Sequence, residues 1–185
     1  MTPGRWSSIA RRIRVPLGFA FAALYLWLAR PTPAFMAISL ILVIPGIWLR
    51  AYASGYVQKN TELTVTGPYA FTRNPLYLGS MLIAFGFALA SRSIWIALIL
   101  AALFAIIYVP VIRSEEAFLR SQFSAFDAYA ASVPRLLPRL SPARSGSGER
   151  GAFSPNLYRK HREYNALMGA AAIYAALALR IYFWG

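Results

Sequence analysis

The sequence predicts an all-α integral membrane protein with five transmembrane helices and a cytoplasmic amphipathic helix. Of its 185 residues, 58% are hydrophobic and only 14% are charged, whereas a soluble domain carries about 25% charged residues. The apolar residues also gather in five runs along the chain. These runs are 15–29, 34–49, 76–90, 94–112 and 166–182.

The composition of the runs supports a membrane-spanning role. The first four contain no charged residue, and the fifth contains only Arg180 near its end. A bilayer core needs about 20 residues of apolar helix, with a range of about 17 to 25. The last two runs are long enough to fall within this range. The first three reach it if Arg14, Arg30 and Arg50 extend their helices to the interface.

The first run has a second interpretation. Arg11, Arg12 and Arg14 precede about fifteen apolar residues, a pattern also typical of a signal peptide. The next apolar run follows after only the four residues 30–33, so we expect a pair of helices joined by a tight turn.

The distribution of basic residues predicts the orientation. Arg30, Arg92 and Arg180 fall on one side of the five predicted spans, and every other Lys and Arg falls on the opposite side together with all six acidic residues. Because cytoplasmic loops carry the excess of Lys and Arg, we expect the N-terminus and the working surface to be cytoplasmic.

The sequence predicts a single domain, 1–185. After the fourth run, this domain also contains segments that do not span the membrane. Apolar residues recur at steps of three and four after the fourth run, with Arg120 and Asp127 on the polar side, which predicts an amphipathic helix. Residues 141–155 read as a flexible cytoplasmic linker before the last span at 164–184. The apolar positions are Leu119, Phe123, Phe126, Ala130 and Val133.

Several classes of function are excluded by composition. There is no cysteine and a single histidine, His161, so we expect neither a metal centre nor a Ser-His-Asp triad. The basic residues follow the topology, so we expect no nucleic-acid partner. Gly146, Gly148 and Gly151 match a dinucleotide fingerprint, but no strand precedes them.

The first candidate motif, 67–79, enters the third span. Asn74 and Pro75 suit an N-cap and a first helical position, which is a purely structural reading. That reading leaves the clustering of Tyr69, Arg73 and Tyr77 unexplained. It also leaves Gly79 unexplained, since a glycine inside a helix costs about 1 kcal/mol relative to alanine and suggests a close approach by a helix or a ligand.

The second motif, 113–120, lies where the fourth span ends. Glu116 has Arg113 at i−3 and Arg120 at i+4, which predicts an ordinary surface ion pair. Glu115 has apolar neighbours at three and four residues, and a carboxylate on an apolar face near a membrane needs a partner or a polar cavity. Glu115 is therefore the stronger functional candidate of the two.

Together the two motifs resemble the isoprenylcysteine carboxyl methyltransferase family, part of a set of membrane methyltransferases that includes the phospholipid N-methyltransferases. The resemblance covers about 55–138 and rests on Gly-Pro-Tyr, Arg-Asn-Pro-x-Tyr-x-Gly and, two spans later, Glu-Glu followed by Val-Pro-Arg. It implies S-adenosylmethionine as cofactor, bound in a cytosol-facing pocket. The cofactor-binding residues it implies are Tyr69, Arg73, Asn74, Pro75, Tyr77, Gly79, Glu115 and Glu116, with Lys59 a weaker carry-over.

By the same resemblance, Arg73, Glu115 and Glu116 are the catalytic residues, with Arg73 on the cofactor's carboxylate and a glutamate on its ammonium. The expected reaction is methylation of a lipid-like acceptor that enters from the membrane, first of all the carboxylate of an isoprenylcysteine-type substrate. Alternatives are a phospholipid amine as acceptor, a related reductase, or a structural or assembly protein without activity.

Overall fold

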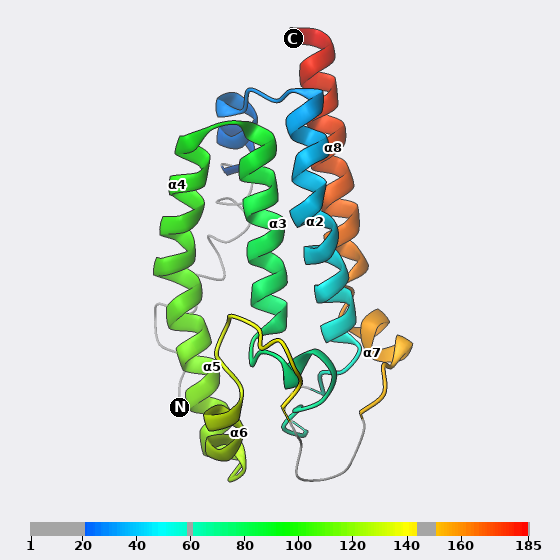
Figure 1. Cartoon of the computed structure of the whole chain (residues 1–185). Helices are drawn as coiled ribbons and strands as arrows, with labels where there is room; N and C mark the ends of the chain where they lie inside the picture. The colour runs from blue at the N-terminus through cyan, green and yellow to red at the C-terminus, as the bar shows by residue number, and fades with distance from the viewer. Residues whose placement is uncertain (1–20, 59–60, 144–150, 185) are drawn as a thin grey trace.

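The computed structural model is a helical bundle whose long helices run alternately up and down (Figure 1). It describes residues 21–58, 61–143 and 151–184, and within these ranges it contains helices and no strand. The long helices are α2 (Pro33–Ser54), α3 (Pro75–Ser91), α4 (Ile94–Leu103), α5 (Val109–Gln122) and α8 (Tyr164–Trp184). The short ones are η1 (Gly67–Ala70), α6 (Phe126–Ser132) and α7 (Pro155–Lys160).

A π-helical segment, η2 (Phe104–Tyr108), joins α4 to α5 in one continuous helical column. Pro110 is the second residue after it and the second residue of α5. A proline inside an α-helix lacks an N–H donor and clashes with the carbonyl four residues earlier. The wider turn of η2 accommodates this proline, so the column continues to Gln122.

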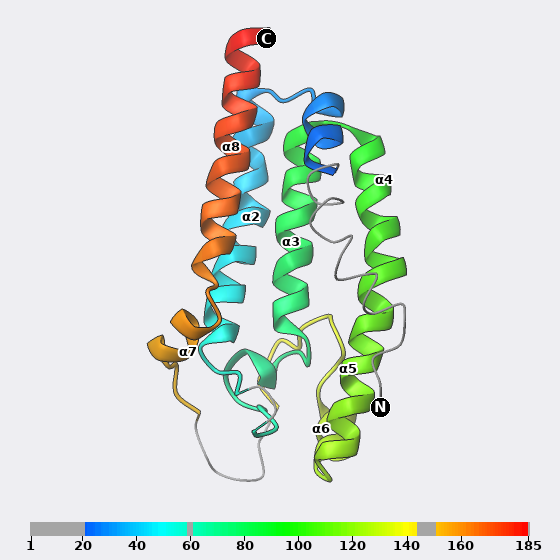
Figure 2. The same cartoon turned by 180° about the vertical axis from the view of Figure 1, so that it is seen from behind.

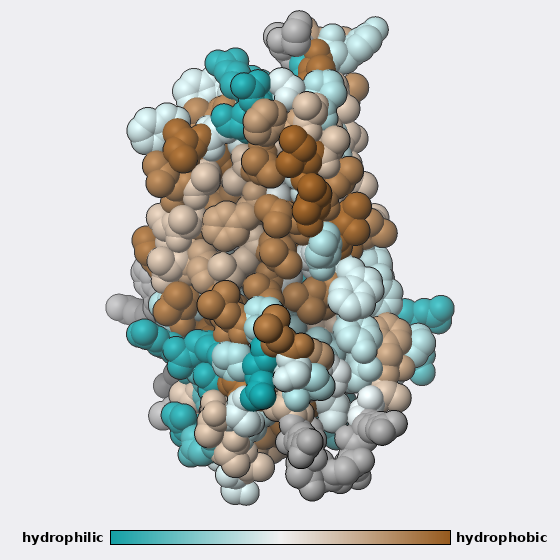
Figure 3. All heavy atoms as spheres, viewed as in Figure 1, coloured by the Kyte–Doolittle hydropathy of each residue, from teal (hydrophilic) through white to brown (hydrophobic). Residues whose placement is uncertain are grey.

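Three of the described helical stretches are long and apolar enough to cross a membrane: Pro33–Ser54, Ile94–Gln122 and Tyr164–Phe183. The helix α3 is apolar but shorter, at 17 residues. The first part of the first predicted span, 15–20, lies outside the described residues, and its remainder is helical at 21–28. On the face shown in Figure 3, an apolar belt crosses the bundle and separates polar surfaces at its two ends. The fold class is thus all-helical, while five spans stay a prediction.

Glycines set the separation of α2 and α3. A Cβ atom placed on Gly79 would lie 2.8 Å from the carbonyl oxygen of Gly46, and one on Gly46 would lie 2.8 Å from the carbonyl oxygen of Gly79. About two turns after Gly79 in α3, a Cβ atom placed on Gly86 would lie 2.4 Å from the side chain of Val43 in α2. The close approach predicted at Gly79 is therefore made by a neighbouring helix.

The remaining helices pack around this pair. Seen from behind, α8 runs beside α2, and α3 lies between α2 and α4 (Figure 2). The segment 21–28 is tied to α3 through the Tyr25 hydroxyl, which donates to the carbonyl of Phe87 at 2.9 Å. Ser39 of α2 and Tyr174 of α8 share a hydrogen bond of 2.6 Å.

The amphipathic segment differs from its prediction. We expected one helix from Leu119 to Val133, but α5 ends at Gln122 and α6 begins at Phe126. The apolar side was predicted correctly, since Phe126, Tyr129 and Val133 are buried against one another with the other apolar positions packed on them. The break lets α6 fold back beneath the bundle.

The predicted linker is only partly described, because 144–150 lie outside the described residues. Its two described ends are fixed to the domain: Ala143 donates its backbone N–H to Ala70, and Ser154 donates to Gly55, each at 2.9 Å. The ring of Phe153 packs on Gly55, and a Cβ added there would lie 2.2 Å from it. Lys59, Gly146 and Gly148 also lie outside the described residues.

Candidate active site

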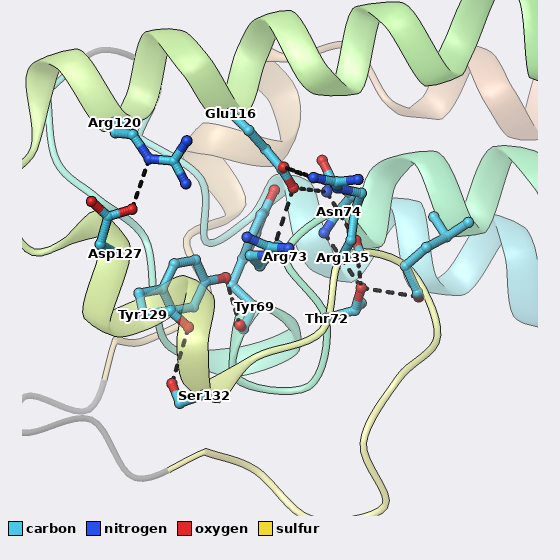
Figure 4. A network of polar contacts seen from close by, with 11 residues as sticks. Tyr69, Thr72, Arg73, Asn74, Glu116, Arg120, Asp127, Tyr129, Ser132 and Arg135 are labelled. Carbon is cyan, nitrogen blue, oxygen red and sulfur yellow. Dashed lines mark hydrogen bonds and ion pairs between the residues drawn. The ribbon is translucent and has the colours of Figure 1, made fainter.

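Two motifs far apart in sequence meet at one end of the bundle. The residues before α3 and the middle of α5 lie side by side, with the segment 133–139 beside them (Figure 4). Glu116 of α5 stands at the junction, and its residue is only 7% exposed. The convergence expected from the sequence is therefore present.

Three side chains bind the Glu116 carboxylate. Arg135 donates through Nε to Oε2 at 2.9 Å and through its terminal nitrogen at 2.8 Å. Asn74 donates through Nδ2 to Oε1 at 3.4 Å, and Arg73 places its Nε 3.5 Å from the same oxygen. A buried carboxylate needs such partners because water no longer solvates its charge.

The segment 133–139, which contains Arg135, is held against the first motif by hydrogen bonds that its main-chain carbonyls accept. We call this segment the strap. The Arg73 N–H donates to the carbonyl of Pro134 at 2.9 Å, and the Thr72 hydroxyl donates to that of Leu136 at 3.0 Å. The Asn74 amide donates to the carbonyl of Arg135 at 2.9 Å. Sequence reasoning assigned Arg135 no role, although its Val-Pro-Arg context belonged to the family pattern.

Asn74 stands at the N-cap position of α3, but its side chain does not cap the helix. It spans from Glu116 to the strap instead. The structural reading of Asn-Pro was therefore right about Pro75, which is the first residue of α3, and wrong about the use of the Asn74 side chain.

The environments expected for the two glutamates are exchanged. Glu116 was expected in a surface pair with Arg113 or Arg120, yet it is buried with Arg73 and Arg135. Arg120 pairs with Asp127 instead, at 2.7 Å, on an exposed surface. Glu115, expected on an enclosed apolar face, is exposed and makes none of the ion pairs found among the described residues.

Glu115 lies beside Tyr77, which in turn contacts Tyr108. Its carboxylate interacts with the hydroxyl of Tyr77 in the first turn of α3. The ring of Tyr77 meets Tyr108 of η2 edge to face, with 5.7 Å between centroids, and Tyr108 stacks on Phe104. The π-helical segment thus holds the aromatic wall next to this carboxylate, as such segments often do at functional sites.

Tyr69 and Tyr129 form the floor of the site. The Tyr129 hydroxyl donates to the carbonyl of Tyr69 at 2.8 Å, and both residues are buried. Burial raises the pKa of Tyr69, and the nearby charges of Glu115 and Glu163 raise it further. Burial also raises the pKa of Tyr129, although the charge of Arg73 opposes this shift.

Arg50, at the end of α2, closes the other side and was not predicted as a site residue. It donates to both carboxylate oxygens of Glu163, from Nε and from a terminal nitrogen, at 3.0 Å each. Its other terminal nitrogen donates to the Leu76 carbonyl at 3.3 Å and to the Ser80 hydroxyl. This pair fixes the start of α8 to the start of α3. The position of Arg50 at the end of an apolar run was the only sequence signal that could have indicated its place in the site.

Tyr69, Arg73, Asn74, Tyr77, Glu115 and Glu116 come together at one end of the bundle, and Pro75 begins the helix between them. Gly79 serves the packing of α2 and Arg50. His161, near the same end, lies 3.0 Å through Nδ1 from the carbonyl oxygen of Ser54.

Among the described residues of the site, Arg73 and Glu115 offer a cation and an anion to a ligand. The Nε of Arg73 is buried without a hydrogen-bond partner, being held only by the longer ion pair with Glu116. The Glu115 carboxylate is exposed. Such an arrangement fits a ligand that carries both a carboxylate and an ammonium group.

Comparison with known proteins identifies the class. The chain is 43% identical over 114 residues to the nickel-cobalt-cadmium resistance protein NccN of Alcaligenes xylosoxydans xylosoxydans, covering 60% of this chain and 53% of that protein. It is 37% identical over 107 residues to the cobalt-zinc-cadmium resistance protein CzcN of Cupriavidus metallidurans, covering 58% and 49%.

The chain therefore spans about half the length of the curated relatives it matches. No solved structure matches it. A family model described as phospholipid methyltransferase matches residues 32–125, which include α2, α3, α4, both site motifs and all of α5. On this match the chain belongs to the phospholipid methyltransferase family of membrane methyltransferases, the set to which the isoprenylcysteine methyltransferases also belong.

Proposed function

We propose that this protein is an S-adenosylmethionine-dependent methyltransferase that modifies a lipid-like acceptor at the membrane surface. The observation that carries the proposal is the ion pair of Arg73 with Glu116, which brings the first motif to the helix α5 that also carries the exposed Glu115. Within a methyltransferase family, a cation and an anion at the same end of the bundle suit an amino-acid-bearing methyl donor.

The roles of the three charged residues follow from their surroundings. Arg73 would hold the carboxylate of the methyl donor, because its Nε is buried and lacks a hydrogen-bond partner. Glu115 would hold the ammonium, because it is the exposed member of the pair. Glu116 is a positioning residue in this proposal, since its carboxylate is already bound by Arg73, Asn74 and Arg135.

When bound, the methyl donor supplies a sulfonium methyl group that is already activated. The protein's task is then mainly alignment, and holding two reactants in attack geometry lowers a barrier by about 7–11 kcal/mol. We assign this alignment to Tyr69, Asn74, Pro75 and Tyr77, whose backbone and rings are fixed by the strap and by α6.

A carboxylate of the isoprenylcysteine type is the first proposed acceptor. Arg50, Arg73 and Arg135 surround this end of the bundle, which favours an anionic substrate. A carboxylate also needs no general base. The chain's only histidine is engaged near the Ser54 carbonyl.

A phospholipid amine is the second proposed acceptor, and one specific observation favours it. An amine must lose a proton on methylation. The exposed Glu115 carboxylate beside the Tyr77 hydroxyl is a group that could accept that proton. In that case Glu115 would face the acceptor instead of the methyl donor.

The names of the two relatives refer to metal resistance. This chain has no cysteine and one histidine, and the described residues hold no group of three potential metal-binding side chains. We propose that any role it shares with these relatives proceeds through methylation of a membrane component.

The test is a transfer assay in lipid nanodiscs with methyl-labelled S-adenosylmethionine. A farnesylated cysteine with a free carboxylate and a phosphatidylethanolamine are offered separately. Label in the cysteine ester supports the first acceptor, and label in the amine supports the second. Glu115→Gln should lose transfer, whereas Glu62→Gln, an exposed carboxylate in the loop after α2, should retain it. No label in either lipid contradicts the proposal and favours a non-enzymatic protein.

A further inference from the structure

The end of the bundle opposite the candidate active site contains a second polar feature. A cavity of about 430 Å³ opens there, lined by Trp27, Leu28, Arg30, Arg92, Ser93, Ile94 and Trp95. We call it the Arg30–Arg92 cavity. A hydrophilic patch lies at this end of the molecule, separated from the polar surface of the other end by the apolar belt (Figure 3).

The two arginines are held at fixed positions by adjoining turns. The Arg30 N–H donates to the carbonyl of Ser91 at 2.7 Å, which joins the turn before α2 to the turn after α3. Ser91 is fully buried, and its hydroxyl accepts from the backbone N–H of Ser93 at 3.2 Å. Both arginine side chains are exposed. The spacing of two exposed cations is thus built into the fold.

Arg92 adopts a backbone conformation that arginine rarely takes. Its φ is 52° and its ψ 26°, in the left-handed region that favours glycine. Its guanidinium lies 4.9 Å from the centre of the Phe35 ring. A residue that bears a large cationic side chain at a position suited to glycine points to a use for that side chain.

No carboxylate offsets these charges within the described part of the chain. All the acidic residues described lie at the other end of the bundle: Glu62, Glu115, Glu116, Asp127 and Glu163. The third arginine at this end, Arg180, is occupied, since it donates to the carbonyls of Leu26 and Trp27. It thereby supports one wall of the cavity.

The aromatic walls place the cavity at the level of lipid headgroups. Trp27 and Trp95 are 71% and 64% exposed, and tryptophan gathers where a membrane meets water. Paired guanidinium groups match the geometry of phosphate oxygens better than lysine does. Residues 93–95, at the positive end of the α4 dipole, line the same cavity.

We propose that the Arg30–Arg92 cavity binds the phosphate of an anionic phospholipid in the leaflet at that end of the bundle. The proposal does not depend on methyl transfer, because the cavity lies at the far end from the methyltransferase motifs. Arg30 and Arg92 contact the phosphate, and the two tryptophans flank the glycerol backbone of the lipid.

Native mass spectrometry tests this on protein released from vesicles that contain equal amounts of phosphatidylglycerol and phosphatidylcholine with identical acyl chains. The wild-type protein should retain phosphatidylglycerol preferentially, by about tenfold, because both lipids carry the phosphate but only phosphatidylcholine brings a positive choline close to Arg30 and Arg92. Arg30→Gln and Arg92→Gly should each lower this preference several-fold. Glycine suits the backbone of residue 92, so Arg92→Gly removes the guanidinium and keeps the turn.

Arg113→Gln is the matched control, because it removes one exposed arginine at the opposite end. Loss of preference in both cavity variants, with Arg113→Gln unchanged, supports the proposal. An equal loss in Arg113→Gln would show a general charge effect and overturn it. It is also overturned if wild-type protein shows no preference, if either cavity variant keeps it, or if millimolar glycerol phosphate displaces the lipid, which would make the ligand a soluble phosphate.

Discussion

Glu116 and Arg73 form a buried ion pair, with 3.5 Å between Oε1 and Nε, although Glu116 lies in α5 and Arg73 lies 43 positions earlier, between η1 and α3. This pair joins the loop before α3 to α5. Removing one partner of a buried ion pair lowers the free energy of unfolding by about 3–5 kcal/mol. Because the half-exposed Arg135 can be solvated by water once Glu116 is gone, we expect a value at the lower end of this range.

We therefore expect Glu116→Gln to lower the free energy of unfolding by about 3 kcal/mol. Reversible unfolding in mixed micelles measures it. Asp127→Asn is the control, because that carboxylate pairs with Arg120 on an exposed surface, where an ion pair contributes about 0–1 kcal/mol. Equal effects of the two substitutions would show that Glu116 does not join the motifs.

Gly79 should tolerate no larger side chain. A Cβ there would lie 2.7 Å from Arg50 Cγ and 2.8 Å from the Gly46 carbonyl oxygen, so Gly79→Ala should destabilise the protein by about 1–3 kcal/mol through overpacking. Gly169→Ala is the matched helical control, with open space around the new atom. It should stabilise the protein by up to about 1 kcal/mol. A stabilising Gly79→Ala would contradict the close α2–α3 contact.

The Arg50–Glu163 pair should couple α8 to the family core. The side chains are 23% and 12% exposed, and the bond is bidentate. A double-mutant cycle with Arg50→Gln and Glu163→Gln should give a coupling energy of about 1–3 kcal/mol. The same cycle on Arg120 and Asp127 should give less than about 1 kcal/mol. A coupling energy no larger than this control would mean that α8 is not held through Arg50.

Stability should fall in strongly alkaline solution because of the buried tyrosines. Burial raises the pKa of Tyr129 above its ordinary value of about 10. Because Tyr129 ionises at a lower pH in the unfolded chain than in the folded protein, its contribution to the free energy of unfolding is complete below pH of about 10. That contribution is lost as the pH rises further. The decline in unfolding free energy from pH 9 to pH 11 should be smaller in Tyr129→Phe. An identical decline would show that Tyr129 ionises freely in the folded protein.

The convergence of the two motifs could be predicted, but the roles of the glutamates could not. In a membrane helix the apolar residues face lipid as well as the core, so apolar neighbours did not distinguish Glu115 from Glu116. Val111 and Phe118 are exposed on the side of Glu115, whereas Ile112 is buried with Glu116. Helical spacing also reports only partners three or four residues away, and Arg73 and Arg135 are far from Glu116 in sequence.

The other differences have similar causes. Periodicity predicted which residues of 119–133 are buried but not the break between α5 and α6, because an interrupted helix that folds back keeps the same apolar side. Asn74 suits an N-cap by residue type, and only the approach of Glu116 and the strap decides otherwise. The predicted cytoplasmic orientation depends on charge alone and stays a prediction.

Binding of the methyl donor by Arg73 and Glu115 together is the central element of the proposed function. Calorimetry with S-adenosylhomocysteine on the purified protein tests it directly. We expect binding by the wild type, unchanged binding by Glu62→Gln, and at least about tenfold weaker binding by Glu115→Gln, which removes one ionic contact. No heat of binding at high micromolar ligand, or equal affinity of wild type and Glu115→Gln, would contradict it.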